Sequence, residues 1–133
     1  LRFLKNLQPE MVGIGPFIPH EDTKMKHCKS GDLKTVLLIL AIVRLLLPKV
    51  LLPATTALST IDPKGRKKGL NVGGNVIMPN LTPRIYREDY SRYNEKMNTG
   101  SESVEELELI KKQLEDYGYI CDMSKGDSKM IDN

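Results

Sequence analysis

The sequence predicts an α/β fold in which short parallel strands alternate with helices. Three short apolar segments are separated by two longer helix-forming segments. The strand candidates are 11–15, the apolar start of 50–57, and 75–80, and the helix candidates between them are 33–47 and 64–72. Strands that alternate with helices pair in parallel, so we expect the middle segment to lie between the other two.

The length of the chain predicts that this sheet is part of a larger one. Three parallel strands cannot close a barrel, and a closed one usually needs roughly 200 residues or more, against 133 here. The chain starts at Leu1 without an initiator Met, inside what reads as the end of a helix. We therefore expect a partial (β/α)8 barrel of the TIM type, comprising its carboxyl-terminal strands and helices, followed by a C-terminal helix and a short strand.

Glycines and prolines mark the first predicted strand and the loop after it. Pro9 ends the opening helix at 1–7, and the following strand contains Gly13 and Gly15. Glycine inside a strand usually marks either a close approach to the backbone or a kink in a tight core, and both interpretations stay open. The loop at 16–23 holds two prolines of fixed φ, so we expect a stiff wall.

Both central helices are bounded by residues that start or stop helices. Ser30–Asp32 offers an N-cap to the helix at 33–47. The helix at 64–72 follows an aspartate and a proline, and a left-handed glycine is expected to end it: Asp62, Pro63, and Gly73 or Gly74.

The last third of the chain predicts two more helices. Thr82–Pro83 starts one at 84–93, where three tyrosines share a face: Tyr86, Tyr90 and Tyr93. Ser103–Glu106 is a capping box for a helix ending near Gly118, and Tyr119–Cys121 is predicted as a short strand.

Composition and charge exclude several classes of function. The basic run Lys64–Lys68 has no interleaved aromatic residues, so we predict no nucleic-acid binding. The aliphatic block at 36–47 is interrupted by Arg44 and is too short for a bilayer, which needs about 20 apolar residues, so no membrane association is predicted. With two cysteines and no secretion signal, the expected location is the cytoplasm, with free thiols.

A metal site and an acid–base pair are not indicated either. His20, His27 and Cys28 lie close in the sequence, but their spacing matches no common ligand pattern, so no metal site is predicted. The sequence shows no recognisable general acid–base pair and no glycine-rich phosphate loop of known spacing, and no catalytic residue is predicted.

The candidate site is the rim where the three predicted strands end. In parallel sheets ligands bind at the carboxyl ends of strands. These ends carry Pro16–Phe17, the adjacent hydroxyls of Thr55 and Thr56, and Pro79–Asn80. We expect them to face one cavity, although two hydroxyls that merely cap a loop would leave the same pattern.

Three motifs in this order resemble a known family. They are MVGIGPFIPH at 11–20, LPATTAL at 52–58 and GNVIMPNLTP at 74–83. Together they are similar to the carboxyl-terminal part of the HydE-type [FeFe]-hydrogenase maturases, which are radical S-adenosylmethionine enzymes related to biotin synthase. The resemblance is close over residues 9 to 95 and loose beyond. It implies a radical S-adenosylmethionine half-barrel at 1–95 and a helix–strand extension with a polar tail at 96–133.

The resemblance also implies cofactors and residue roles. In the complete enzyme a 4Fe–4S cluster on a Cys-x3-Cys-x2-Cys loop cleaves S-adenosylmethionine, and the resulting radical acts on an iron-bound cysteine-type substrate during assembly of the hydrogenase cluster. By the same resemblance, Met11 and Tyr90 contact the cofactor, and the substrate contacts are Thr55, Thr56, Pro16 and Tyr93. The implied partners are the missing amino-terminal half of the barrel and other hydrogenase maturation proteins.

Departures from the family pattern limit what this chain is expected to do. It has no Cys-x3-Cys-x2-Cys loop, so its cysteines are expected to bind no cluster. The segment 98–109 has no cysteine for an accessory cluster. Alone, the chain is expected to be inactive. A methylornithine synthase-like or biotin synthase-like fragment and a non-catalytic split subunit remain as alternatives.

Overall fold

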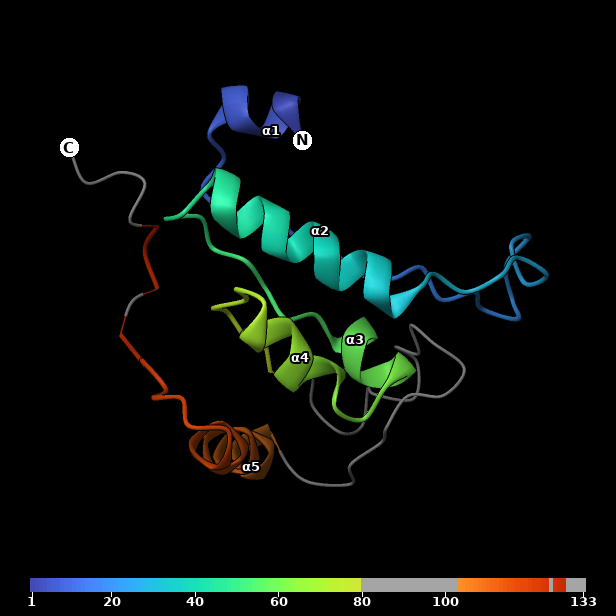
Figure 1. The fold of residues 1–133 in the computed structure, drawn as a ribbon. Helices are drawn as coiled ribbons and strands as arrows, with labels where there is room; N and C mark the ends of the chain where they lie inside the picture. Colours follow the sequence, from blue (N-terminus) through green and yellow to red (C-terminus); the bar gives the residue numbers. More distant parts are fainter. Residues whose placement is uncertain (80–102, 125, 129–133) are drawn as a thin grey trace. The chain divides into compact units, whose positions relative to one another are not determined.

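The computed structural model describes residues 1–79, 103–124 and 126–128, which fall into two compact units. The first unit takes residues 1–18, 28–77 and the chain end from 127, and the second takes 19–27 and 78–126. Figure 1 labels five helices within these described residues: α1 (Arg2–Leu7), α2 (Leu33–Leu46), α3 (Thr56–Ile61) and α4 (Gly65–Asn71) in the first unit, and α5 (Ser103–Asp116) in the second.

Helix α2 forms where a cap and an apolar face coincide. The Asp32 carboxylate accepts hydrogen bonds from the backbone N–H and the hydroxyl of Thr35, both at 2.8 Å. These bonds satisfy a helix-terminal donor and hold the pKa of Asp32 below its ordinary value. Three residues at helical spacing are buried along one face: Val36, Leu40 and Val43. The predicted helix at 33–47 is thus confirmed to within one residue.

Helix α4 is also where the sequence places it, and glycines let it pack closely. A Cβ atom on Gly65 would overlap the carbonyl group of Leu58 in α3, and one on Gly69 would come within 2.8 Å of the Leu58 side chain. Figure 1 shows α3 and α4 side by side, with α2 alongside α4. The close contact between α3 and α4 therefore depends on residues without side chains.

Arg44 ties the end of α2 to the end of α4. Its Nε atom donates to the Gly73 carbonyl at 2.8 Å, and one terminal nitrogen donates to the Pro48 carbonyl at 2.8 Å. Burial lowers the pKa of Arg44. Gly73 has φ of +113°, as expected for a left-handed glycine after a helix, and a Cβ there would also lie 2.6 Å from Arg44 Cγ.

The predicted strands pair in parallel and in the predicted order, but only through single bridges. Met11 pairs with Leu51, and Pro53 pairs with Val76, so the middle segment lies between the other two. Leu51 makes 2.9 Å backbone hydrogen bonds to the residues on either side of Met11. The alternation of pairing sides along the middle segment is that of a parallel sheet.

Regular strands were predicted here, and that expectation is wrong for the described residues. Past Leu51, the next backbone donor toward the Met11 segment would come from position 53, where proline has no N–H. On the other side the Leu52 N–H bonds to the Asn75 side chain at 2.8 Å. The ladder stops after one bridge on each side, and the described residues contain no barrel.

Helix α3 is a second difference from the sequence-based expectation, which placed a loop between the middle strand and Asp62. Thr55 is extended, with φ of −66° and ψ of 155°, and serves as the N-cap position. Ala57 and Leu58 are buried within the helix. Their burial stabilises a six-residue helix whose β-branched residues give it little propensity of its own.

The second unit contains α5, which begins at Ser103 as predicted. Ile110 and Leu114 are buried, and Gly118 follows the helix with φ of +82°. Tyr119–Cys121 was predicted as a strand, but within the described residues no segment pairs with it, so that prediction is wrong. The predicted helix at 84–93 and the proposed boundary at residue 95 lie outside the described residues.

Among the helices that the structure describes, none has the length and apolar character needed to cross a membrane.

Candidate functional site

One face of the paired segments in the first unit carries several of the predicted site residues. Parallel neighbours opposite each other point the same way, and side chains alternate between faces along each strand. Met11 lies opposite Leu51, and a Cβ atom on Gly15 would lie next to the Thr55 side chain. We call the alternate residues Met11, Gly13, Gly15, Leu51, Pro53 and Thr55 the odd-numbered side; of these, Pro53 is fully buried.

The opposite face packs on the helices and forms part of the core. Its residues Val12, Leu52 and Ala54 are buried, and Ala54 lies against Gly69 of α4. A strand pair with one face packed on helices leaves its other face for contacts of a different kind. On the odd-numbered side, Met11 remains 46% exposed.

The two glycines on the odd-numbered side have different surroundings. A Cβ atom built on Gly13 would meet nothing within 4 Å, so the backbone there borders open space. A Cβ atom on Gly15 would lie 2.9 Å from Thr55 Oγ1 and 3.6 Å from the Ala57 side chain. Gly13 thus has no close neighbour among the described residues, whereas Gly15, although exposed, lies close to the Thr55 side chain.

Thr55 supplies the polar group of this side. Its Oγ1 atom is buried and has no hydrogen-bond partner in the part of the chain that the structure describes. Thr55 occupies the N-cap position of α3, yet its side chain makes no capping bond, and only its carbonyl accepts the Leu58 N–H, at 3.1 Å. An unpaired buried hydroxyl costs free energy, about 1–3 kcal/mol, unless a ligand or water pairs with it.

Thr56 and Pro16, both predicted to contact substrate, lie differently. Thr56 is exposed in the first turn of α3, where its carbonyl accepts the Thr60 hydroxyl at 3.2 Å. Pro16 is buried, and a Cβ on Gly31, just before α2, would lie 3.3 Å from its Cα. The predicted roles of Met11, Thr55, Thr56 and Pro16 all stay predictions.

Several predicted residues cannot be placed. Tyr90 and Tyr93 lie outside the described residues, as do Tyr86 and Asn80. Pro79 is described, but it belongs to the second unit.

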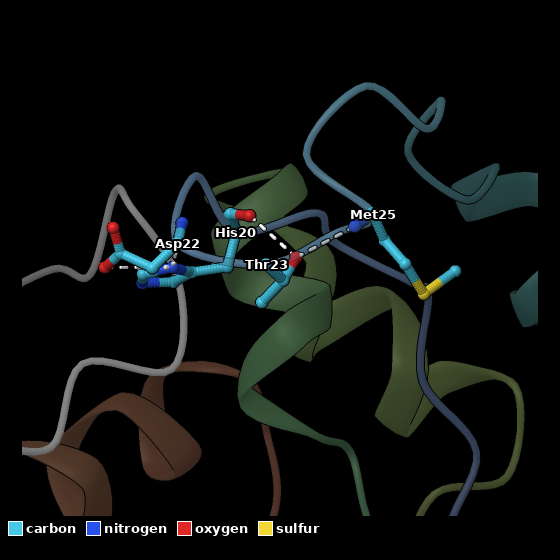
Figure 2. Close-up of polar contacts among 4 residues, drawn as sticks. All are labelled: His20, Asp22, Thr23 and Met25. Carbon is cyan, nitrogen blue, oxygen red and sulfur yellow. Dashed lines mark hydrogen bonds and ion pairs between the residues drawn. The ribbon is translucent and has the colours of Figure 1, made fainter.

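The loop at 19–27, in the second unit, is braced by its own side chains (Figure 2). The His20 carbonyl accepts the Thr23 hydroxyl at 2.8 Å, and the Thr23 hydroxyl accepts the Met25 N–H at 3.3 Å. His20 Nδ1 accepts the Asp22 N–H at 3.2 Å, which places the proton of a neutral ring on Nε2. The sequence marked His20 only as a possible ligand, and the Thr23 turn was not anticipated.

The described residues contain no group of three His, Cys, Asp or Glu side chains that could hold a metal. Cys28 is exposed, and Cys121 is half-buried beside Met123, with their sulfur atoms 3.5 Å apart. A cluster bound by three cysteine thiolates does not fit this chain, because its sequence has two cysteines.

The six residues of the odd-numbered side include no titratable side chain. The groups with displaced pKa values lie elsewhere: hydrogen bonds from Lys68 and the Lys64 backbone lower the pKa of Asp62, and the Glu108 carboxylate raises that of Lys111. A side with an open backbone, a thioether and one unpaired hydroxyl suits an elongated, partly apolar ligand that carries a hydrogen-bond acceptor.

Comparison with known proteins identifies relatives of this chain. No protein-family model matches the chain. The chain is 45% identical over 115 residues to the [FeFe] hydrogenase maturase subunit HydE of Thermotoga maritima, a match covering 86% of this chain and 33% of that protein. It is also 32% identical over 118 residues to the 3-methylornithine synthase of Methanosarcina acetivorans, covering 89% of this chain and 32% of the synthase.

The Methanosarcina barkeri 3-methylornithine synthase is 29% identical over 118 residues. The chain thus spans about a third of the length of the curated relatives it matches. The resemblance predicted from the three sequence motifs is confirmed.

Proposed function

We propose, from the premise that this chain is related in sequence to the HydE-type [FeFe]-hydrogenase maturases, that it forms the part of such a maturase that lines the reaction chamber. In this proposal the chain supplies the last strands and helices of a radical S-adenosylmethionine barrel. The chamber wall is the odd-numbered side, and the chemistry belongs to the complete enzyme.

The observation that carries the proposal is the arrangement of Met11, Gly13 and Thr55. Met11 is 46% exposed, the backbone at Gly13 borders open space, and Thr55 Oγ1 is buried without a partner in the described chain. A (β/α)8 barrel binds ligands at the carboxyl ends of its strands. This side has the composition of such a wall: no charge, little bulk and one hydrogen-bonding group.

The spacing along the wall suits two molecules bound end to end. Gly15 lies four positions after Met11, so an extended chain covers about 13 Å between them at a rise of roughly 3.3 Å per residue. We assign the Met11 end to the adenosine part of S-adenosylmethionine, where a polarisable thioether packs well on an aromatic ring. The Thr55 end is assigned to the carboxylate of an iron-bound cysteine-type substrate, which would accept the Thr55 hydroxyl proton.

The cluster that initiates radical chemistry must come from elsewhere. Bound to S-adenosylmethionine, a 4Fe–4S cluster supplies the electron that cleaves the cofactor, but the two cysteines of this chain do not suffice to hold it. The proposed partner is therefore a polypeptide segment equivalent to the portion of the maturase that this chain does not span. Other hydrogenase maturation proteins are proposed as later partners.

The 32% identity to 3-methylornithine synthase supports a second candidate, in which the same wall serves that synthase's reaction. Both candidates use the odd-numbered side in the same way and differ in the substrate at the Thr55 end. A non-catalytic subunit that only docks with a half-barrel is a third outcome.

A chimera tests the proposal. The 115 aligned residues of the Thermotoga maritima maturase are replaced by those of this chain, and the purified protein is assayed with S-adenosylmethionine and a reductant. We expect 5′-deoxyadenosine, abolished when a cluster cysteine of the maturase is changed to serine. A folded, cluster-loaded chimera that gives no product would refute the assignment to the chamber.

Genetic complementation separates the candidates. The chimera is introduced into a strain without its HydE, and an equivalent chimera into a strain without 3-methylornithine synthase. Restored hydrogenase maturation supports the first candidate, and restored 3-methylornithine formation supports the second. Restoration of neither, despite cofactor cleavage, would point to another substrate.

A further inference from the structure

We propose that Gly15 is a positioning residue for the Thr55 hydroxyl. Because Gly15 has no side chain, it leaves the room in which Thr55 Oγ1 stays directed toward a bound carboxylate. The inference rests on the proposed function. It assigns to Gly15 a role that the three motifs alone do not give.

The first step is the geometry of the pair. Gly15 lies beside Thr55, so that a Cβ on Gly15 would lie 2.9 Å from Thr55 Oγ1. Real Cβ atoms avoid so short a contact, so any larger residue at position 15 would displace the hydroxyl. The Ala57 side chain, 3.6 Å from the same point, limits room on the far side.

The second step excludes a backbone reason for this glycine. The described glycines with positive φ are Gly73 and Gly118, and Gly15 is not among them. An alanine at position 15 could therefore adopt the same backbone conformation. What it could not do is leave the Thr55 side chain where it is.

The third step is the state of the hydroxyl. Thr55 Oγ1 is buried, makes no bond within the described chain and does not cap α3. Threonine is β-branched and has few χ1 choices, so pushing the hydroxyl would move it to another rotamer rather than by a small distance. A hydroxyl held unpaired in one rotamer is a preformed donor for a ligand oxygen, and a carboxylate is the acceptor that gains most from it.

The test uses two probes that differ only in the carboxylate. L-cysteine and cysteamine are titrated into the chimera, and the ratio of their dissociation constants reports carboxylate recognition. Four variants are compared with the parent: Gly15→Ala, Thr55→Ala, the double variant, and Gly13→Ala, which introduces the same methyl group into open space two residues away.

We expect the parent to prefer L-cysteine by about tenfold, in line with one hydrogen bond to a charged group. Gly15→Ala and Thr55→Ala should each reduce that preference to near unity while leaving cysteamine binding unchanged, and the double variant should lose no more than either single one. Gly13→Ala should keep the carboxylate preference. A parent without preference would contradict the assigned carboxylate in the proposed function, whereas a preference retained by Gly15→Ala would overturn the role of Gly15 alone.

Thermal melting supplies an independent readout. Gly15→Ala should lower Tm by several degrees, and adding Thr55→Ala should restore it, because the atom that the new methyl group meets is gone. The same logic applies if Gly15→Ala does not fold: a folded double variant supports the inference. A double variant as impaired as Gly15→Ala would overturn it.

Discussion

Arg44 and Gly73 are joined by a 2.8 Å hydrogen bond from the arginine Nε to the glycine carbonyl, and the same arginine donates to the Pro48 carbonyl. The bond links the last turn of α2 to the residue that follows α4. It fixes the entrance of the chain into the segment that pairs with Pro53. In the sequence, this arginine argues only against a membrane span. In the structure, it links two helices by hydrogen bonds.

We expect Arg44→Met to reduce the free energy of unfolding by about 2 kcal/mol, because two charge-assisted bonds to carbonyls are lost while the apolar stem is kept. Denaturant unfolding of the chimera measures this. Leu45→Ala, at a neighbouring residue that is 81% exposed, is the control and should change stability by no more than about 0.5 kcal/mol. Equal effects of the two changes would contradict the proposed role of Arg44 in linking the two helices.

Gly13→Ala should leave stability unchanged or raise it slightly, by up to about 1 kcal/mol, since a Cβ there meets nothing and alanine has less freedom when unfolded. If the open space is occupied by S-adenosylmethionine, the same methyl group should weaken cofactor binding. Equilibrium dialysis and thermal melts separate the two effects. Normal cofactor affinity would show that the space at Gly13 is not part of the cofactor site.

Gly65→Ala should be among the most destabilising single-methyl changes in the first unit. The new methyl group would overlap a backbone carbonyl of α3, and backbone cannot rotate away as a side chain can. We expect a loss of about 3 kcal/mol, at the upper end of overpacking costs. Urea midpoints, with Gly13→Ala as the matched substitution, give the comparison, and a midpoint equal to the parent's would mean that α3 and α4 are not held so closely.

Thr55→Val should weaken L-cysteine binding by about tenfold, because valine keeps the shape and loses the hydroxyl. Cleavage of S-adenosylmethionine in the absence of substrate should largely persist. Thr56→Val is the natural comparison, and its effect should be smaller, since Thr56 is exposed in α3. Titration of both variants decides between them, and a larger loss from Thr56→Val would transfer the carboxylate contact to that residue.

Acid should weaken α2 through its cap. The folded pKa of Asp32 is below its ordinary value of 3.8, so folding favours the ionised carboxylate. Its contribution is therefore complete above that value and is lost as pH falls through the folded pKa. Asp32→Asn keeps an acceptor for Thr35 but does not titrate, so its unfolding curve should vary less with pH below 4. Circular dichroism melts from pH 2.5 to 6 measure the difference, and parallel curves for the two proteins would contradict it.

Helices were predictable from sequence where their start signals are local. Asp32, the proline after Asp62 and Ser103 each act within a few residues, and α2, α4 and α5 follow them closely. Helix α3 was not predicted, because Thr55 caps it through backbone geometry alone and its stability comes from burying Leu58. Burial depends on partners distant in the sequence, and a short window does not contain them.

The candidate site was predictable only in part, because some of its contacts join residues that are distant in the sequence. The motifs led to Met11, which pairs with Leu51, and to Thr55, whose hydroxyl is buried and unpaired in the described chain. The different surroundings of Gly13 and Gly15 could not be predicted from the sequence, because they depend on which residues of other segments lie near each glycine. The prediction of a regular middle strand was wrong at Pro53. That prediction followed the apolar run and did not take into account that proline has no backbone N–H to donate.

Pro53 has a consequence for how the chain behaves in isolation. A continuous ladder of donors would offer a template on which a second copy could add a strand, the first step toward fibrillar aggregation. A central segment lacking that donor is a poor template. Were the Met11 segment displaced, the edge that it leaves on the middle segment would therefore be a poor site for a second copy to add a strand.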